Sequence, residues 1–319
     1  MEQAPVVKIA SFNIANSSYE EAKFPLWQRL PCLLEYITNS AAKFNFDILC
    51  VQELQGTGVG RNDGRSSLSV FGVIDSIRSA LMSASIDRDW QVVYSKVNPT
   101  KNSFYRATFY DVNRLMVKRN TVFTVIDSED SPDDHLVMET DFYWATSTST
   151  GAAATVTAQA GFRVLNCHAP MNLKDKTVYW QLMSDRLTEN CPQGVRPQIV
   201  KACYSLAIGD VNKFSEHLDV YRGIFDARGT PDRIQGELTF VSFDFNLNPE
   251  GQQWRSSLDA VISHGDNKIG VEIVPTVFDS HSGNLAVSSP DGDSIKGLQY
   301  PMRPTDHFLI VATVNSWAN

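Results

Sequence analysis

The hydrophobic and polar positions of the chain follow strand-like and helix-like spacings in alternation. Residues 6–14 (VVKIASFNI) are rich in apolar and β-branched side chains, which predicts a first strand. Apolar residues then recur every three or four positions over 25–44, which predicts an amphipathic helix. Residues 46–54 (FDILCVQEL) form a nearly continuous apolar run, a pattern typical of a strand covered on both faces. After a glycine-containing loop at 56–65, a second amphipathic helix is predicted over 68–84.

The remainder of the chain is mostly strand-like. Strands are predicted at 90–96, 106–118, 121–126, 141–148, 162–167, 205–210, 238–242, 258–263, 269–274 and 307–314, with a helix at 174–187. Residues 146–160 are rich in Ser, Thr, Ala and Gly, which fits either a domain linker or a hairpin. Strand-like alternation continues through this segment, so we favour a hairpin inside one domain. The order of elements predicts an α/β fold with two central sheets and helices outside.

Composition narrows the function classes. The 319 residues contain 28 Lys+Arg and 36 Asp+Glu, a formal net charge of −8. This balance argues against a protein that coats nucleic acid by bulk charge, because such binding neutralises phosphates with basic side chains. It leaves open an enzyme that meets phosphate through a few local cations or a metal. We expect an intracellular protein, cytoplasmic or nuclear, without integral membrane association, because no leader and no run of about 20 apolar residues is visible.

The spacing of the five cysteines matches no common metal-binding or redox motif. They form no CxxC pair, which argues against a zinc ribbon or a thioredoxin-like redox motif. Cys50 and Cys167 lie within apolar runs, so both are predicted to be buried as small hydrophobic residues.

Polar residues gather at the ends of the predicted strands, where loops present side chains to ligands. They are Asn13, Glu53, His168, Asp210 and Asn212 in GDVN, Asp259 in SSLDAVI, and Asp306 with His307 in PTDHFLI. Each has an ordinary structural explanation, such as a rim carboxylate, a turn, a strand cap or a loop histidine. Packing alone does not explain so many polar residues beside strongly apolar strands.

This set of side chains suits metal-assisted attack on a phosphate ester. The carboxylates of Glu53 and Asp306 are the hard oxygen ligands that Mg²⁺ or Mn²⁺ prefers. Asp210 and Asn212 are two residues apart, so an extended segment points both to the same side. One can orient or deprotonate a water molecule while the other donates to a phosphate oxygen.

The histidines complete this chemistry. His168 and His307 can donate hydrogen bonds to the negative charge that grows on phosphate in the transition state. A carboxylate such as Asp259 can hold His307 in one tautomer and favour its protonated form.

Six segments in this order, SFNIAN, DILCVQEL, LNCHAP, IGDVNKF, SSLDAVIS and PTDHFLI, resemble the motif series of the endonuclease/exonuclease/phosphatase superfamily. The resemblance spans residues 6–314 and implies a deoxyribonuclease-like, four-layer α/β sandwich. In this fold two mixed sheets pack face to face with helices outside. The resemblance also implies that residues 1–319 form one domain.

By this resemblance, Glu53 is the principal Mg²⁺ ligand, with Asn13 beside it and Asp306 near the same metal. Asp210 positions or activates the attacking water, and Asn212 contacts phosphate.

His168 is implied to be a phosphate contact, and His307, paired with Asp259, to stabilise the pentacovalent phosphate. The implied reaction is in-line hydrolysis of a phosphoester.

Superfamily membership does not select a substrate. The leading hypothesis is a Mg²⁺-dependent phosphodiesterase acting on nucleic acid. The alternatives are a phosphomonoesterase or phospholipase for inositol phosphates, nucleotides or sphingolipid, and a catalytically silent binding module. The signature Trp-Cys-Asp-Arg of inositol polyphosphate 5-phosphatases is absent.

Several residues near these motifs have two interpretations. Arg106, Arg114 and Lys118 flank predicted strands and are either phosphate contacts or solvated surface, and we favour the surface. The glycines of 56–64 are interpreted as structural, with substrate contact as the alternative. Trp254 either stacks on a base or packs within the protein.

Overall fold

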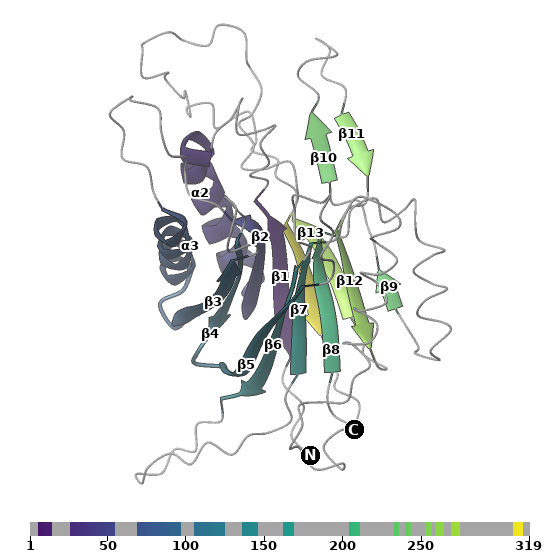
Figure 1. The fold of residues 1–319 in the computed structure, drawn as a ribbon. Coiled ribbons are helices and arrows are strands. Elements are labelled where there is room, and N and C mark those ends of the chain that lie inside the picture. Colours follow the sequence, from purple (N-terminus) through teal and green to yellow (C-terminus); the bar gives the residue numbers. More distant parts are fainter. Residues whose placement is uncertain are drawn as a thin grey trace, which may run out of the picture.

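Two six-stranded sheets dominate the fold (Figure 1). The computed structural model describes residues 6–14, 26–54, 69–96, 105–124, 136–145, 162–168, 204–210, 233–235, 240–243, 253–256, 259–264, 269–274 and 309–314. No helix in these ranges is both long and apolar enough to cross a membrane.

The first sheet has the strand order β13-β14-β1-β2-β4-β3. Its strands are β1 (Val7–Asn13), β2 (Ile48–Leu54), β3 (Trp90–Lys96), β4 (Tyr105–Asp111), β13 (Ile269–Val274) and β14 (Leu309–Val314). β1 and β2 are parallel, whereas the other neighbours are antiparallel. The crossover between the parallel strands contains helix α2 (Leu26–Phe44), and helix α3 (Val70–Ala84) packs beside it.

The second sheet has the order β5-β6-β7-β8-β12-β9. Its strands are β5 (Leu115–Thr124), β6 (Leu136–Trp144), β7 (Phe162–His168), β8 (Tyr204–Asp210), β9 (Arg233–Gln235) and β12 (Asp259–His264). β7 and β8 are parallel, and the other neighbours are antiparallel. A separate antiparallel pair is formed by β10 (Phe240–Phe243) and β11 (Gln253–Ser256).

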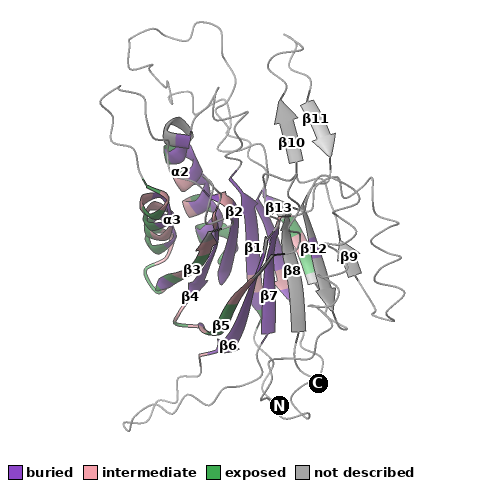
Figure 2. Ribbon diagram, in the orientation of Figure 1, coloured by how far each residue is buried: buried purple, intermediate pink, exposed green. Residues whose placement is uncertain are grey.

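Apolar side chains form two cores. One core lies between the helices and the first sheet and includes Leu33, Ile37 and Phe109. The other lies between the two sheets and includes Ile9 from the first sheet and Phe142 from the second. Both faces of β1 and β2 are therefore covered, which explains their almost continuous burial (Figure 2).

The predicted α/β sandwich with two mixed central sheets is thus confirmed, and the helices over the first sheet form one outer layer (Figure 1). The helix predicted at 174–187 and the segment 146–160 lie outside the described residues. That residues 1–319 form a single domain stays a prediction.

The boundaries of two predicted strands are wrong. Residues 106–118 form not one strand but most of β4, a turn and the start of β5, which belong to different sheets, and residues 121–124 continue β5 rather than forming a separate strand. The Asp111 side chain accepts a hydrogen bond from the Asn113 backbone N–H at 3.0 Å, a local contact with which Asp stabilises turns. The chain changes sheets at this turn.

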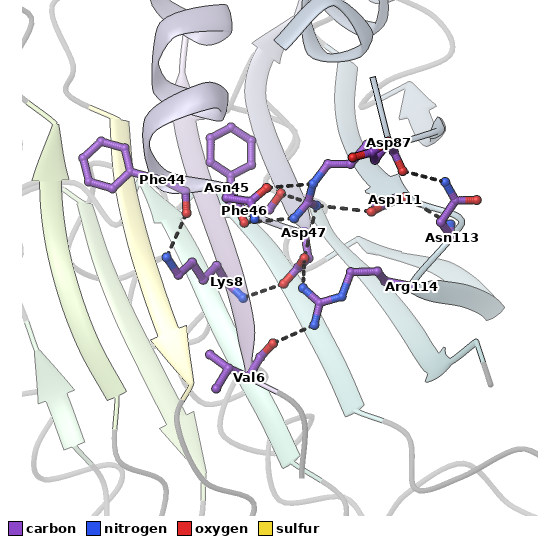
Figure 3. A network of polar contacts seen from close by, with 11 residues as sticks. Val6, Lys8, Phe44, Asn45, Phe46, Asp47, Asp87, Asp111, Asn113 and Arg114 are labelled. Atoms are coloured by element: carbon purple, nitrogen blue, oxygen red, sulfur yellow. Dashed lines mark hydrogen bonds and ion pairs between the residues drawn. The ribbon is translucent and has the colours of Figure 1, made fainter. Parts of the chain in front are cut away.

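A buried carboxylate holds together the strand ends at one edge of the first sheet (Figure 3). Asp47, fully buried just before β2, accepts hydrogen bonds from the Lys8 backbone N–H at 2.9 Å and from Arg88 Nη1 at 3.1 Å. Arg114 Nη1 also donates to Asp47, while its Nη2 donates to the Val6 carbonyl. Asp47 therefore links β1 and β2 to the turns before β3 and before β5.

We predict that Asp47→Asn destabilises the protein by about 2–4 kcal/mol, because it removes a buried charge partner of Arg88 and Arg114, although Arg88 keeps its ion pair with Asp111 at 3.3 Å. We place the range below the largest values for buried pairs because the Arg114 side chain is 37% exposed. Urea denaturation measures the change. The same substitution at exposed Asp75 on α3 is expected to stay within about 0.5 kcal/mol of wild type. Equal losses of stability at the two positions would contradict the proposed role of Asp47 in linking the strand ends.

Candidate functional site

The topology brings five of the predicted site residues to strand ends. Asn13 is the last residue of β1 and pairs with Gln52 of β2. Glu53 directly follows Gln52 along β2. His168 is the last residue of β7 and pairs with Asp210, the last residue of β8. Since β1 is parallel to β2 and β7 to β8, the carboxyl ends of each pair lie at the same edge of their sheet.

Asp259 joins the second of these pairs. It is the first residue of β12 and pairs with Asp210 in the antiparallel ladder. The backbone register thus aligns His168, Asp210 and Asp259 across three neighbouring strands.

Side-chain contacts join the two sheets at this edge. Asn13 Nδ2 donates a hydrogen bond to Glu53 Oε1 at 3.0 Å, and His168 Nε2 lies 3.4 Å from the same oxygen. Asn13 is completely buried, whereas the side chains of Glu53 and His168 are 12% and 22% exposed. The carboxylate of Glu53 therefore lies between Asn13 of the first sheet and His168 of the second.

Glu53 has an unusual backbone conformation. Its φ angle is +54°, in the left-handed region that non-glycine residues rarely adopt. The register between β2 and β4 shifts between Val51 and Leu54, which marks a β-bulge around Glu53. Bulges re-aim side chains next to functional sites, and strain of this kind persists where the surrounding structure enforces it.

A layer of buried polar side chains lies directly behind these residues. Gln52 Nε2 of the first sheet donates to Asn166 Oδ1 of the second at 2.8 Å, and also to Ser11 Oγ at 3.0 Å. Asn166 Nδ2 donates to the carbonyl oxygens of Ala107 at 3.0 Å and Val51 at 3.4 Å, and to Thr108 Oγ1 at 3.4 Å. Sequence reasoning missed Gln52 and Asn166, although each is a polar residue inside an apolar strand.

The preferred interpretation of Arg106 as solvated surface is wrong. Arg106 is only 3% exposed and donates from Nη2 to the carbonyl oxygen of His168 at 3.3 Å. Arg114 contacts Asp47, but its side chain is 37% exposed, so it stays at the surface. Arg106 faces the second sheet because it alternates along β4 with Ala107, which belongs to the core under the helices.

Two buried cysteines of the described region, Cys32 and Cys50, are poorly suited to act as nucleophiles. Burial raises the pKa of the Cys50 thiol, and burial together with the nearby charge of Glu35 raises that of Cys32. Both thiols therefore stay protonated near neutral pH. The predicted burial of Cys50 and Cys167 is confirmed.

The remaining candidates have less structural support. Asn212, Asp306, His307 and the loop 56–64 lie outside the described residues. Trp254 lies in β11, where its backbone pairs with Ser242. Among the side chains that the structure describes, no three from His, Cys, Asp and Glu gather in a way that could hold a metal ion.

Comparison with solved structures shows the fold of endonuclease/exonuclease/phosphatase proteins. A protein of this family from Bacteroides thetaiotaomicron matches with a TM-score of 0.60 and 15% identity, covering 98% of both chains. TDP2 from D. rerio, complexed with a single-strand DNA product, matches with a TM-score of 0.57 and 10% identity, covering 98% of this chain and 100% of TDP2. ANGEL2, described as a 2',3'-cyclic phosphatase, matches with a TM-score of 0.55 and 11% identity, covering 97% and 95%. No known family model and no curated protein matches the sequence.

We predict that the Glu53→Gly variant is more stable toward unfolding than the Glu53→Ala variant, the reverse of the usual order within strands. Both substitutions remove the contacts with Asn13 and His168, but only glycine adopts the φ of +54° without steric cost. Glu53→Gly is expected to exceed Glu53→Ala by about 1 kcal/mol in free energy of unfolding, measured by chemical denaturation.

Exposed Glu272 in β13 is the matched control for this comparison. There alanine is expected to be more stable than glycine, because Gly weakens a strand interior. The same order at both positions would show that the bulge does not impose this conformation on residue 53.

Proposed function

We propose that the chain is a divalent-metal-dependent phosphodiesterase that hydrolyses nucleic acid. The observation that carries this proposal is the contact of Asn13 and His168 with one oxygen of Glu53, at the sheet edge where the paired Asp210 and Asp259 lie. This arrangement supports the motif resemblance, because residues from three distant segments, carried by two sheets, are in contact.

The described part of the site fits a hard cation. Asn13 and Glu53 both carry oxygen donors of the kind that Mg²⁺ and Mn²⁺ prefer, and the Glu53 side chain is 12% exposed. We propose that Glu53 and Asn13 hold the metal together with Asp306. When bound, such an ion neutralises negative charge that develops on phosphate.

The other residues act on water and on the substrate. In the proposed reaction Asp210 orients the attacking water and accepts its proton, and Asn212 donates to a phosphate oxygen. His168, placed beside Glu53, donates to a second phosphate oxygen.

We further propose that His307, held by Asp259, donates to the charge that accumulates on the pentacovalent phosphate. Asp259 pairs with Asp210 in the backbone, so this acid starts its strand next to the one that orients water. In this arrangement water is activated next to the group that stabilises the transition state.

Nucleic acid is the proposed substrate because a neighbour of this fold, D. rerio TDP2, was solved with a single-strand DNA product. Smaller phosphate esters remain the second candidate, supported by ANGEL2, whose description is that of a 2',3'-cyclic phosphatase.

We predict that Asp210→Asn lowers kcat/KM by about 10²- to 10⁴-fold, the range for loss of a general base. The assay uses labelled single-stranded DNA, single-stranded RNA and abasic duplex with Mg²⁺, beside inositol phosphates, nucleotides and sphingomyelin. Asp75→Asn on α3 serves as the control and is expected to retain wild-type activity. Turnover of small phosphate esters alone would exclude nucleic acid as the substrate. If no compound were hydrolysed, the proposal that the chain is a phosphodiesterase would be contradicted.

We predict that Mg²⁺ stabilises the wild-type protein and not Glu53→Ala, because a ligand that binds only the folded state adds to its stability. At a concentration 100 times Kd the gain is about 2.7 kcal/mol, detected as a rise in Tm. A similar rise in Glu53→Ala would place the metal elsewhere. Ca²⁺ in place of Mg²⁺ reports whether the site accepts the larger ion.

A further inference from the structure

We infer that Asn166 and Gln52 are positioning residues that hold the β2 bulge, and with it Glu53, in place for catalysis. This inference rests on the proposed function for its catalytic part. Neither residue reaches the outside, since both side chains are completely buried. They act through the backbone and through their neighbours.

Asn166 reaches from the second sheet into the first. Its Nδ2 donates to the carbonyl oxygens of Val51 and Ala107, which are themselves paired residues of β2 and β4. This pair is the last one before the register shift to Leu54 and Tyr105. Asn166 therefore binds the two strands of the first sheet at the point where their regular ladder is interrupted.

The interruption determines where Glu53 lies. A bulge inserts an extra residue and re-aims the side chains that follow it. Glu53 lies inside the shifted segment with its φ of +54°, a conformation that a regular strand does not impose. Contacts that stabilise the bulge from behind therefore stabilise the position of the Glu53 carboxylate.

Gln52 completes the connection. It donates to Asn166 Oδ1 in the second sheet and to Ser11 Oγ in β1. Ser11 lies two residues before Asn13, Gln52 one residue before Glu53, and Asn166 two residues before His168. One group of hydrogen bonds thus relates the three strands that carry Asn13, Glu53 and His168.

A purely structural role would not need these amides. The core between the sheets also contains many apolar residues, such as Val164 and Ile310, and apolar side chains would fill the same volume without polar groups to satisfy. Hydrogen bonds differ from apolar contacts in being directional, so they fix relative position as well as proximity.

The test compares Gln52→Met, Asn166→Leu and the double variant with wild type, at a temperature where circular dichroism shows all of them folded. We expect each single variant to lower kcat and to raise the Mg²⁺ concentration for half-maximal rate, together about 10- to 100-fold, the usual effect of losing a group that orients metal ligands. Because the two amides act as one unit, the double variant is expected to lose no more than the worse single variant.

Thr140→Val is the matched control. Thr140 is buried in β6 and donates to Asn120 Oδ1 at 3.0 Å, so the substitution removes one hydrogen bond of the second sheet away from this edge. It is expected to leave kcat and the Mg²⁺ dependence unchanged. A loss of activity equal to that of Asn166→Leu would make stability the common cause and overturn the inference.

A crystal structure of Asn166→Leu gives a readout independent of activity. We expect the φ of Glu53 to leave the left-handed region and the 3.0 Å contact between Asn13 and Glu53 to be lost. An unchanged Glu53 would overturn the positioning role even if the wild type is a nuclease. A displaced Glu53 in a protein without phosphodiesterase activity would leave the positioning role standing while the proposed function fails.

Discussion

The hydrogen bond from Gln52 to Asn166 crosses between the sheets one layer behind Glu53 and His168. Apolar packing sets the separation of two sheets at about 10 Å, but it is non-directional and tolerates small sliding movements. A site assembled from both sheets does not tolerate them, because the contacts at Glu53 Oε1 are about 3 Å long. Directional bonds between buried amides limit this sliding, and the arrangement of Asn13, Glu53 and His168 depends on them.

The opposite edge of the first sheet is polar as well. There, at the amino-terminal ends of β1 and β2, the fully buried Asp47 accepts a hydrogen bond from the Lys8 backbone and forms ion pairs with two arginines (Figure 3). The apolar core thus lies between a charged network at one end and an amide network at the other. Movement of β1 against β2 would disturb both networks, so the parallel pair is fixed at each end.

Much of the architecture could be predicted from the sequence because its signals are local. Apolar runs and helical spacing correctly indicated the central strands and helices α2 and α3. The structure brings three of the polar residues at predicted strand ends, Asn13, Glu53 and His168, into contact. The motif order added the sandwich, which the solved structures share at only 10–15% identity.

The missed features depend on distant partners. The bulge at Glu53 exists only relative to β4, more than 50 residues away, and no local pattern around residue 53 encodes it. Arg106 was misassigned for the same reason, since a cation beside a strand is ordinarily solvated, and its burial comes from the second sheet. Asn166 and Gln52 did carry a signal, because an amide within a continuous apolar strand must find a partner in the core.

The net charge of −8 has a specific consequence for the proposed reaction. A protein with this charge does not attract a polyanion by its overall field, so affinity for nucleic acid has to arise locally.

At the described edge of the sheets, the carboxylate oxygen Oε1 of Glu53 is already approached by a nitrogen of Asn13 and a nitrogen of His168. Paired Asp210 and Asp259 add two further acids at neighbouring backbone positions. Acids at these positions would, on the proposed function, repel phosphate unless a cation reversed the local sign, as a bound divalent ion does. On the proposed function, metal binding is therefore a condition for substrate binding as well as for chemistry.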